Sequence, residues 1–248
     1  MTEAVLEADL HTLVDLLAQG AYDDTRRGLP SSVLEKAYRL IPADHARFVE
    51  FDDRGGKHYV AQGYGYLGED SDPGEGPFWR HYWDCLACSY PSRSGDERSI
   101  TMISDFYSDR QFHNLGMYAE YFGPLGFERE IMLCLRAPAG RTRRLIFFRG
   151  AGSNFSERDR LLLTLLRPHL DELYQRLEFR RRGLQDLTRR QRQLLQLVAA
   201  GHTNAEIAKQ LFISAPTVRK HLENIFERLG VASRTAAAAL AFPHGFAL

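Results

Sequence analysis

The chain has 248 residues, 44% of them hydrophobic and 26% charged, and its 32 Lys and Arg balance its 32 Asp and Glu. This composition argues against disorder along most of the chain, and the length favours two unequal domains. No apolar run approaches the roughly eighteen residues of a membrane span, and the acidic start lacks the basic region of a signal peptide. Three cysteines do not suggest a disulfide framework. We therefore expect a cytoplasmic protein with no membrane partner.

The first part of the chain begins with helical patterns and continues with strand patterns. One helical stripe is formed by Leu6, Leu10, Leu13 and Leu17, and a second short helix is expected over 31–41. The period then changes to two, so "ARFVEFD" and "KHYVAQGYGY" are predicted to form an antiparallel hairpin around a turn at 53–56. Two further strands, "EIMLCLRAP" and "RRLIFFRG", give a sheet of at least four strands.

Helices are expected between the two hairpins, over 78–89 and 108–122. Strands and helices therefore do not alternate as a parallel doubly wound sheet requires, and an α+β domain with an antiparallel sheet fits better. The same argument speaks against a phosphorylated receiver domain, because Asp52 and Asp53 fall in a hairpin turn rather than at the mouth of a parallel sheet.

A long helix leads out of this domain. It is predicted to start at a capping box of Ser156 and Asp159 and to carry a leucine stripe past Pro168, which should kink it. The basic run and the glycine of "EFRRRGLQ" are typical of a linker. We therefore divide the chain into an N-terminal domain at 1–178, a linker at 179–186 and a C-terminal domain at 187–248.

The C-terminal domain is predicted to be all α, with four helices whose start and stop signals can be read one by one. The caps are Thr188 with Gln191, Thr203 with Glu206, Ser214 and Ser233, while Gly201 and Gly230 end the first and third helices. Residues 176–248 hold 12 Lys and Arg against 5 Asp and Glu, a net charge of +7, whereas 1–175 hold 20 against 27, a net charge of −7. A basic C-terminal module suits a polyanion such as double-stranded DNA.

The third of these helices has two distinct faces. Its buried stripe is formed by Val218, Leu222, Ile225 and Leu229, which recur at spacings of four, three and four. The opposite face presents Arg219, Lys220 and Glu223, as a recognition helix in the major groove would. Arg can bind a guanine edge through two hydrogen bonds, Lys can reach guanine or phosphate, and Glu can accept from the cytosine amino group.

The segment "LTRRQRQLLQLVAAGHTNAEIAKQLFISAPTVRKHLENIFERLGVASRTAAA" resembles the LuxR-type helix-turn-helix family through most of its length. The matching positions are Leu187-Thr188, Arg190, Gly201, Asn204, Glu206-Ile207-Ala208, Ser214, Thr217-Val218, His221, Leu229 and Ser233-Arg234. The resemblance implies a DNA-binding transcription regulator with Arg219, Lys220 and Glu223 at base-contacting positions, and a fourth helix that helps the domain dimerise. Gln191 and Pro216 depart from the family pattern, and Pro216 removes a phosphate-binding side chain.

The predicted DNA-binding residues are Asn204, Ser214, Thr217, Arg219, Lys220, His221, Glu223 and Asn224. Of these, His221 lies at the edge of the buried stripe and is expected to pack or to bind phosphate rather than to read a base. We expect a homodimer that places two such helices on an inverted repeat, with RNA polymerase as a further candidate partner.

Aromatic residues are dense in the N-terminal domain, where 15 of the 28 lie between Tyr59 and Phe127. Such a cluster either lines an apolar pocket for an unidentified small-molecule effector or fills a core. The candidate ligand-binding residues are Tyr64, Tyr66, Trp79, Trp83, Phe106 and Tyr118.

In outline the domain resembles the GAF or PAS-like sensor domains found ahead of LuxR-type modules, through "FWRHYWDCLACSYP", "SDFYSDRQFHNLGMYAEYF" and "NFSERDRLLLTLLRPHL". Asp72-Pro73 followed by Trp79 and Trp83 is only weakly similar to the acyl-homoserine-lactone receptors. No lactone ligand is therefore predicted.

The remaining candidate site is formed by His81, Cys85 and Cys88, which fall at i, i+4 and i+7 of a predicted helix and could hold a metal or act as a redox switch. Because a structural zinc site usually has a fourth ligand, two buried thiols are favoured over a metal site, and no cofactor is predicted. No nucleophile elbow, phosphate loop or zinc-protease pair is present, so we do not expect an enzyme. A purely protein-binding adaptor is the alternative to a DNA reader.

Overall fold

The computed structural model describes residues 28–65 and 75–242. The chain divides into two compact units, with the boundary between Asp171 and Glu172. The predicted leucine-striped helix near the start of the chain lies outside the described residues. Over the part of the chain that is described, no helix combines the length and the apolar character that a membrane crossing needs.

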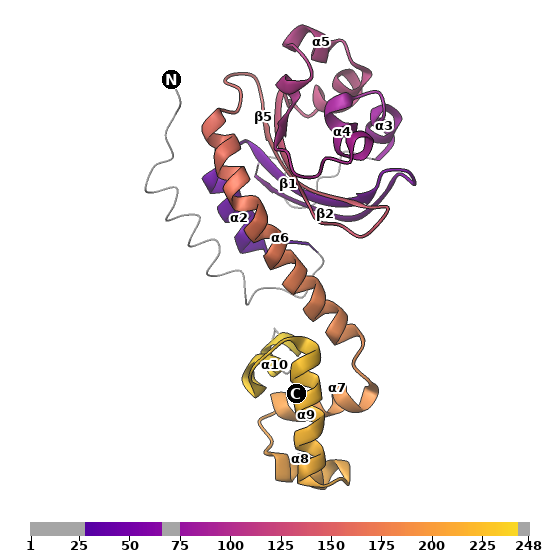
Figure 1. Ribbon diagram of the computed structural model, residues 1–248, viewed down its shortest axis with the longest axis vertical. Helices are drawn as coiled ribbons and strands as arrows, with labels where there is room; N and C mark the ends of the chain where they lie inside the picture. The colour runs from indigo at the N-terminus through magenta and orange to yellow at the C-terminus, as the bar shows by residue number, and fades with distance from the viewer. Residues whose placement is uncertain (1–27, 66–74, 243–248) are drawn as a thin grey trace. The chain divides into compact units, whose positions relative to one another are not determined.

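The N-terminal unit is built on a five-stranded antiparallel sheet in the order β2-β1-β5-β4-β3 (Figure 1). The strands are β1 (His45–Asp52), β2 (Lys57–Gly65), β3 (Thr101–Met102), β4 (Arg129–Leu135) and β5 (Thr142–Arg149). Both predicted hairpins are confirmed, and pairing of β1 with β5, in which His45 lies opposite Phe148, joins them into one sheet. The predicted α+β class with an antiparallel sheet is therefore confirmed.

Helices cover both faces of this sheet, which explains why β1, β4 and β5 are buried along nearly their whole length. On one face, Val49, Met132 and Phe148 share a hydrophobic cluster with aromatic residues of the segment between β2 and β4. Figure 1 shows α3 (Glu75–His81), α4 (Leu86–Ser94) and α5 (Asp109–His113) on this side, and α2 (Ser31–Leu40) with α6 (Glu157–Gln185) on the other. The helix predicted over 31–41 is confirmed as α2.

The single helix predicted over 78–89 is wrong, because α3 and α4 are separate helices with a break at 82–85. The apolar period continues through the break, so the sequence does not mark it. Tyr82 is fully buried there, and its hydroxyl accepts a hydrogen bond from Nη2 of Arg144 at 2.7 Å. Burial of this side chain against the sheet turns the chain, and α4 starts afresh after Cys85.

The single helix predicted over 108–122 is also wrong. Helix α5 ends at His113, and the chain resumes as a wide turn over Tyr118–Phe122, in which Gly123 N–H bonds to the Tyr118 carbonyl at 2.8 Å. Gly116 lies in the interruption, where a Cβ atom would come within 2.4 Å of the His81 ring. The close approach of α3 therefore favours glycine in the segment that connects the two turns.

The long helix α6 begins with the predicted capping box, since Ser156 N–H donates to Asp159 and Asp159 N–H donates to the Ser156 hydroxyl. It runs without interruption through Pro168. All of the predicted linker at 179–186 except Asp186 is part of this helix. The domain boundaries given above stay a prediction.

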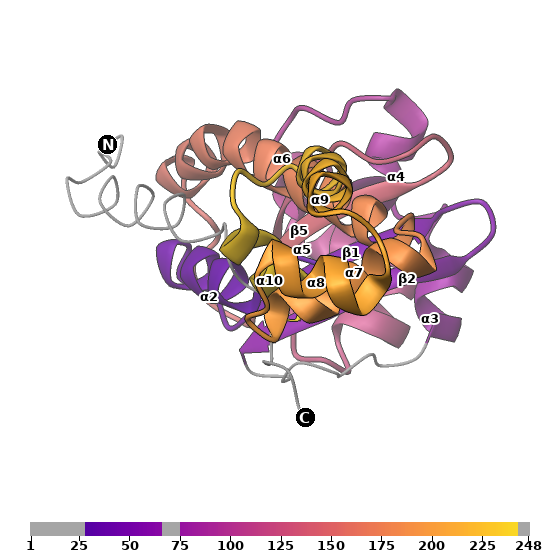
Figure 2. The same ribbon diagram turned by 90° about the horizontal axis from the view of Figure 1, so that it is seen from below.

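The C-terminal unit contains the four predicted helices, α7 (Arg189–Ala199), α8 (Asn204–Leu211), α9 (Ala215–Leu229) and α10 (Arg234–Ala241). The side chains of Thr188, Thr203, Ser214 and Ser233 each accept a hydrogen bond from a first-turn N–H, and Gly230 ends α9 in the left-handed region. Figures 1 and 2 together show α9 running across the direction of α7. One core joins all four helices, and its buried members are Leu187, Leu194, Leu195, Val198, Ile207, Ala208, Val218, Leu222, Ile225, Leu229 and Ala237.

Gly183 gives a test of the contact between the end of α6 and the end of α9. A Cβ atom at Gly183 would lie 2.4 Å from the Arg228 carbonyl oxygen, which is backbone and cannot swing away. We expect Gly183→Ala to destabilise the protein, because an overlap of this kind costs roughly 1–3 kcal/mol and outweighs a helix-propensity gain of up to about 1 kcal/mol. Urea unfolding of the full chain, followed by circular dichroism, measures the difference.

Gly76 in α3 is the matched control, because apart from its chain neighbours and the backbone of its own helix no heavy atom lies within 4 Å of the Cβ position there. Gly76→Ala should leave the free energy of unfolding unchanged or raise it. A Gly183→Ala protein as stable as Gly76→Ala would contradict the close packing of α6 on α9.

Candidate functional site

Helix α9 is held in one orientation by its apolar stripe. Val218, Ile225 and Leu229 are fully buried, and Leu222 is 5% exposed. Because these residues occupy one side of the helix, Arg219, Lys220, Glu223 and Asn224 are exposed on the other. The predicted division of α9 into a core face and a polar face is therefore present in the structure.

The three central side chains of the polar face are loosely associated. The side chains of Arg219 and Lys220 are 75% and 73% exposed, and their nitrogens lie 4.0 and 3.9 Å from the Glu223 carboxylate, which is 56% exposed. Exposed ion pairs of this length contribute about 0–1 kcal/mol, so the pairs do not hold the side chains in place. All three can turn toward a base edge or a phosphate.

The start of α9 is capped by two of the predicted DNA-binding residues. The Ser214 hydroxyl accepts from Thr217 N–H at 3.2 Å and lies 2.8 Å from the Thr217 hydroxyl. Pro216 occupies the first turn, where its missing N–H breaks no intrahelical bond. Ser214 and Thr217 therefore set the direction of the helix, and their hydroxyl groups are exposed on its N-terminal end.

Two further predicted residues lie in different surroundings. Asn204 begins α8, and its side-chain oxygen accepts from Nη1 of Arg234 at 2.9 Å, which ties α8 to α10. His221 is half-buried on α9 beside the apolar stripe. The structure thus gathers Ser214, Thr217, Arg219, Lys220, His221, Glu223 and Asn224 on α9 and its cap, with Asn204 on a neighbouring helix.

The turn between α8 and α9 contains a residue to which the sequence pattern gave no role. Phe212 is 94% exposed and has a φ of 53°, in the left-handed region. A side chain with Cβ costs roughly 1–2 kcal/mol there. The sequence carries no signal for this exposure, because Phe212 lies next to the half-buried Leu211 and Ile213 and continues an apolar run.

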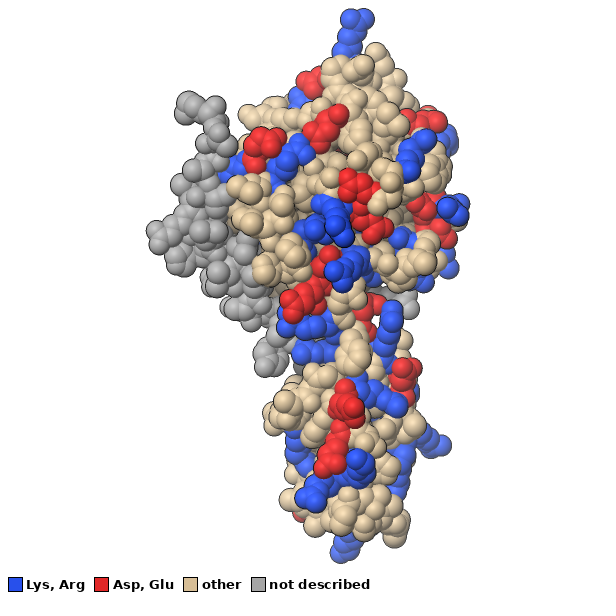
Figure 3. All heavy atoms as spheres, in the orientation of Figure 1, with Lys and Arg blue, Asp and Glu red and all other residues tan. Residues whose placement is uncertain are grey.

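Basic side chains are spread over the C-terminal unit on the face drawn in Figure 3, interrupted by a smaller group of acidic ones. This distribution agrees with the net charge of +7 carried by residues 176–248. A surface of this kind attracts a phosphate backbone and releases its condensed counterions.

The N-terminal unit contains a cavity of about 30 Å³ on the sheet face covered by α3 and α4. Its apolar lining is Val49, Phe51, Phe78, Phe122, Ile146 and Phe148, and its polar lining is Arg47, His58, Cys88, Tyr121, Glu130 and Arg144. Space of this size holds one or two molecules as small as water.

Three buried charged residues, Arg47, Glu130 and Arg144, belong to the polar part of the cavity. Arg144 is 2% exposed, and its guanidinium donates to the Cys88 carbonyl at 2.6 Å and to the Tyr82 hydroxyl at 2.7 Å. Burial raises the pKa of Glu130 to about 7, although the nearby Arg144 acts in the opposite direction. Near neutral pH this carboxyl group can therefore hold or release a proton inside the domain.

Two of these cavity residues, Arg144 and Glu130, have no predicted role from the sequence pattern. Arg144 stands in the apolar strand "RRLIFFRG", and Glu130 stands in "EIMLCLRAP". Ionisable side chains in strands that are apolar on both faces could have indicated a buried polar site, because such groups are rarely buried without a partner.

The predicted ligand-binding aromatics do not line this cavity. Trp79 packs edge-on against Phe51, with ring centroids 5.2 Å apart, and Tyr64 packs against Tyr38 at 5.1 Å. Phe106 packs against Tyr90 at 5.2 Å, and Trp83 is 40% exposed. Tyr66 lies outside the described residues.

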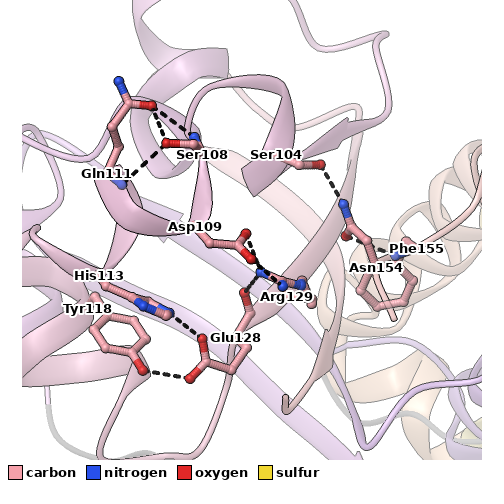
Figure 4. A network of polar contacts seen from close by, with 10 residues as sticks. All are labelled: Ser104, Ser108, Asp109, Gln111, His113, Tyr118, Glu128, Arg129, Asn154 and Phe155. Atoms are coloured by element: carbon pink, nitrogen blue, oxygen red, sulfur yellow. Dashed lines mark hydrogen bonds and ion pairs between the residues drawn. The ribbon is translucent and has the colours of Figure 1, made fainter. Parts of the chain in front are cut away.

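The sixth candidate, Tyr118, belongs to a polar network at the end of α5 (Figure 4). Its hydroxyl donates to Glu128 at 2.6 Å, and the same carboxylate accepts from Nε2 of His113 at 2.5 Å. Asp109 accepts two hydrogen bonds from the neighbouring Arg129. These contacts join α5 to the start of β4, and a ligand-binding role of Tyr118 stays a prediction.

The common helical face predicted for His81, Cys85 and Cys88 is wrong. His81 ends α3 and lies 3.2 Å from Glu120, whereas Cys85 is extended and precedes α4. Within residues 28–65 and 75–242, no three His, Cys, Asp or Glu side chains are grouped so as to hold a metal ion. All three cysteines are buried free thiols.

Comparison with known proteins identifies the helical unit. Residues 185–241 match the family described as bacterial regulatory proteins, luxR family. Over 57 residues the chain is 47% identical to the putative HTH-type transcriptional regulator YhjB of Escherichia coli (strain K12) and 46% identical to the transcriptional regulatory protein LiaR of Bacillus subtilis (strain 168). These matches cover 23% of this chain and 28% and 27% of the relatives, so the chain matches less than a third of their length.

Two solved structures are similar over more of the chain. SdiA in complex with octanoyl-rac-glycerol gives a TM-score of 0.41 at 16% identity, covering 96% of each chain. The VqsR LBD domain from Pseudomonas aeruginosa gives a TM-score of 0.47 at 17% identity, covering 69% of this chain and 94% of that one. The sequence match assigns residues 185–241 to a family, and those residues contain α7 to α10 and the whole polar face of α9.

Proposed function

Residues 185–241 are a helix-turn-helix domain of the LuxR family, and on that premise we propose that the chain is a sequence-specific DNA-binding transcription regulator. The observation that carries the proposal is the polar face of α9, on which Arg219, Lys220 and Glu223 are exposed while the apolar stripe is buried. A solvated helix of an adaptor protein needs no such set of base-reading side chains. RNA polymerase is the further partner that we propose for the regulator.

In this proposal α9 enters the major groove of double-stranded DNA. Arg219 binds a guanine edge, Lys220 binds guanine or phosphate, and Glu223 accepts from a cytosine amino group. The exposed hydroxyls of Ser214 and Thr217 and the half-buried ring of His221 approach the phosphate backbone, where they fix the register of the helix. Pro216 offers no phosphate contact, so affinity depends more on the remaining side chains.

A homodimer on an inverted repeat is the assembly that we propose. Support comes from α6, where Leu161 and Leu165 lie one turn apart and are 47% and 42% exposed. A two-fold axis would bury both leucines of each protomer against the same residues of the other and would present two copies of α9 to two half-sites. Light scattering of the full chain tests this assembly.

We also propose that the N-terminal unit is the regulatory part. The supporting observation is the cavity in its core, which places Arg144 and Glu130 beside aromatic rings. A buried space in which polar groups stand beside apolar and aromatic side chains is typical of ligand recognition. In the described structure the cavity accepts only a group as small as one or two water molecules, so a larger effector requires α3 and α4 to move from the sheet.

A gel-shift assay of the full chain on a pool of random duplexes tests DNA binding. We expect retardation at low salt that weakens as salt rises, because each neutralised phosphate lowers the slope of log K against log salt by about 0.9. The double variant Arg219→Ala with Lys220→Ala should bind more weakly at every salt concentration. If the duplexes were not retarded at low salt, the DNA-binding proposal would be wrong and a protein-binding adaptor would be the remaining interpretation.

A further inference from the structure

Cys85 and Cys88 lie at two positions of α4 whose side chains meet. Cys85 is the residue before the helix, with extended backbone angles of φ −90° and ψ 107°, and Cys88 is the third residue inside it. In Ser108 and Gln111 of α5, and in Thr188 and Gln191 of α7, the same two positions hold side chains that bond each other's backbone. At these positions of α4 the thiols of Cys85 and Cys88 are hydrogen-bonded to each other, so the two side chains face each other across the first helical turn.

This position brings the two cysteines within the range of a disulfide. Side chains three residues apart inside a helix have Cβ atoms about 5–6 Å apart, whereas a disulfide needs about 3.5–4.5 Å. The extended backbone of the capping residue directs its side chain over the first turn, which shortens the separation. Cys85 and Cys88 are 1% and 3% exposed, so no solvent layer separates them.

The two thiols differ in acidity. The hydrogen bond from the Cys88 thiol lowers the pKa of Cys85 despite its burial, and the N–H groups of Cys88 and Ala87 act in the same direction. The hydrogen bond to Cys85, together with burial, raises the pKa of Cys88 well above its ordinary value. Cys85 is therefore the better nucleophile of the pair, and Cys88 is the thiol that remains protonated.

A small space adjoins the pair on the side of Cys88. Cys88 lines the cavity of about 30 Å³, beside the buried guanidinium of Arg144. Nη1 of Arg144 donates to the Cys88 carbonyl at 2.6 Å, and Tyr107 accepts from Leu86 N–H at 2.6 Å, so the first turn of α4 is fastened from both sides. A hydroperoxide group has about the size of one or two water molecules and fits this space.

We infer that Cys85 and Cys88 are a redox couple that closes to an intramolecular disulfide in reaction with a hydroperoxide. The Cys85 sulfur attacks the terminal peroxide oxygen, the O–O bond breaks, and the departing oxygen leaves as water or an alcohol with the thiol proton. The Cys88 sulfur then attacks the resulting Cys85 sulfenic acid, the S–O bond breaks, and the hydroxyl leaves as water with the Cys88 proton. Two thiols are oxidised, one peroxide is reduced, and a dithiol reductant reverses the change.

Peptide mass spectrometry of the full chain tests this couple. The folded protein is treated with hydrogen peroxide, and the remaining thiols are then alkylated in denaturant. We expect the peptide that contains Cys85 and Cys88 to lose two hydrogen atoms and to resist alkylation, while Cys134 is alkylated. Cys134 is the internal control, because burial raises its pKa to about 11 and it lies on β4, far in the sequence from the other two cysteines.

Single variants assign the two roles. Cys88→Ser should stop at a sulfenic acid on Cys85 that dimedone traps, and Cys85→Ser should slow oxidation of Cys88 roughly tenfold or more. Cys134→Ser should form the same disulfide as the wild type. The inference would be overturned if Cys134 were oxidised as fast as Cys85, or if the wild-type protein formed no disulfide under these conditions. Both outcomes are measured on the wild-type protein, so they do not depend on the folding of a variant.

Discussion

Glu130→Gln is expected to raise the free energy of unfolding at pH 8 and to remove much of the fall in stability that the wild type shows between about pH 5 and pH 7. Burial raises the pKa of Glu130 from 4.5 to about 7 in the folded protein. Its stabilising effect is therefore fully present below the unfolded pKa and is lost as the pH rises through about 7, because the ionised carboxyl is disfavoured in the core. Glutamine has nearly the same volume and does not titrate.

The size of this effect follows from the shift. Each unit of pKa difference corresponds to about 1.4 kcal/mol, so the shift of Glu130 from 4.5 to about 7 allows at most about 3.5 kcal/mol between the low-pH and high-pH limits. In the wild type, the attraction between Arg144 and the Glu130 carboxylate opposes the effect of burial on the pKa. Glu130→Gln removes both this attraction and the unfavourable free energy of burying the carboxylate. Urea unfolding of wild type and variant from pH 4 to pH 8 measures the difference.

Glu97→Gln is the control for this experiment, because Glu97 is exposed in the same unit. It should change the free energy of unfolding by no more than about 0.5 kcal/mol at any pH. If the stability of Glu130→Gln has the same pH dependence as that of the wild type, the Glu130 carboxyl has an ordinary pKa in the folded protein. The cavity would then contain no carboxyl group that titrates near neutral pH.

The C-terminal unit could be predicted almost residue by residue because its signals are local. Each helix start depends on side chains three positions apart, such as Thr203 with Glu206, and these form the same bonds in the folded chain. The buried stripe of α9 is set by its own period, so Arg219 and Lys220 could be assigned to the opposite face. None of this requires knowledge of a distant contact.

The N-terminal site could not be predicted in this way, because contacts between distant residues decide it. The break between α3 and α4 depends on Tyr82 meeting Arg144, which is 62 positions away in the sequence. The sequence pattern placed His81 and the two cysteines on one helix, since the apolar period runs through the break. The cysteines retained their local relation, whereas His81 joined Glu120 from another segment.

Arg144 links the separate features of this unit. Its guanidinium donates hydrogen bonds to the Cys88 carbonyl and the Tyr82 hydroxyl, and it lines the cavity together with Glu130. A change in the ionisation of Glu130 or in the redox state of the Cys88 thiol would therefore act on the same buried cation. Both proposed inputs would therefore act on the hydrogen bond between Arg144 and the Cys88 carbonyl, which holds α4 against the sheet.

Arg219→Ala is expected to weaken binding to the preferred operator by about 1–3 kcal/mol and to relax discrimination at one base pair in each half-site. The reason is that Arg219 is the exposed guanidinium near the start of α9, where a recognition helix reads base edges. Loss of a phosphate contact alone would weaken all duplexes by a similar factor. Selection of duplexes from a random pool, followed by titration of selected and single-mismatch sites at one salt concentration, separates the two effects.

Arg176→Ala is the matched control, because Arg176 is also a well-exposed arginine paired with a glutamate one turn away, Glu172, at 3.6 Å. It lies on α6, away from the recognition helix in sequence, and its removal should leave the base preferences unchanged. If the wild type and Arg219→Ala selected the same duplex sequences, the proposal that Arg219 reads a base would be wrong. A changed preference at one position, with Arg176→Ala like the wild type, would tie the specificity of the regulator to the polar face that the core stripe of α9 exposes.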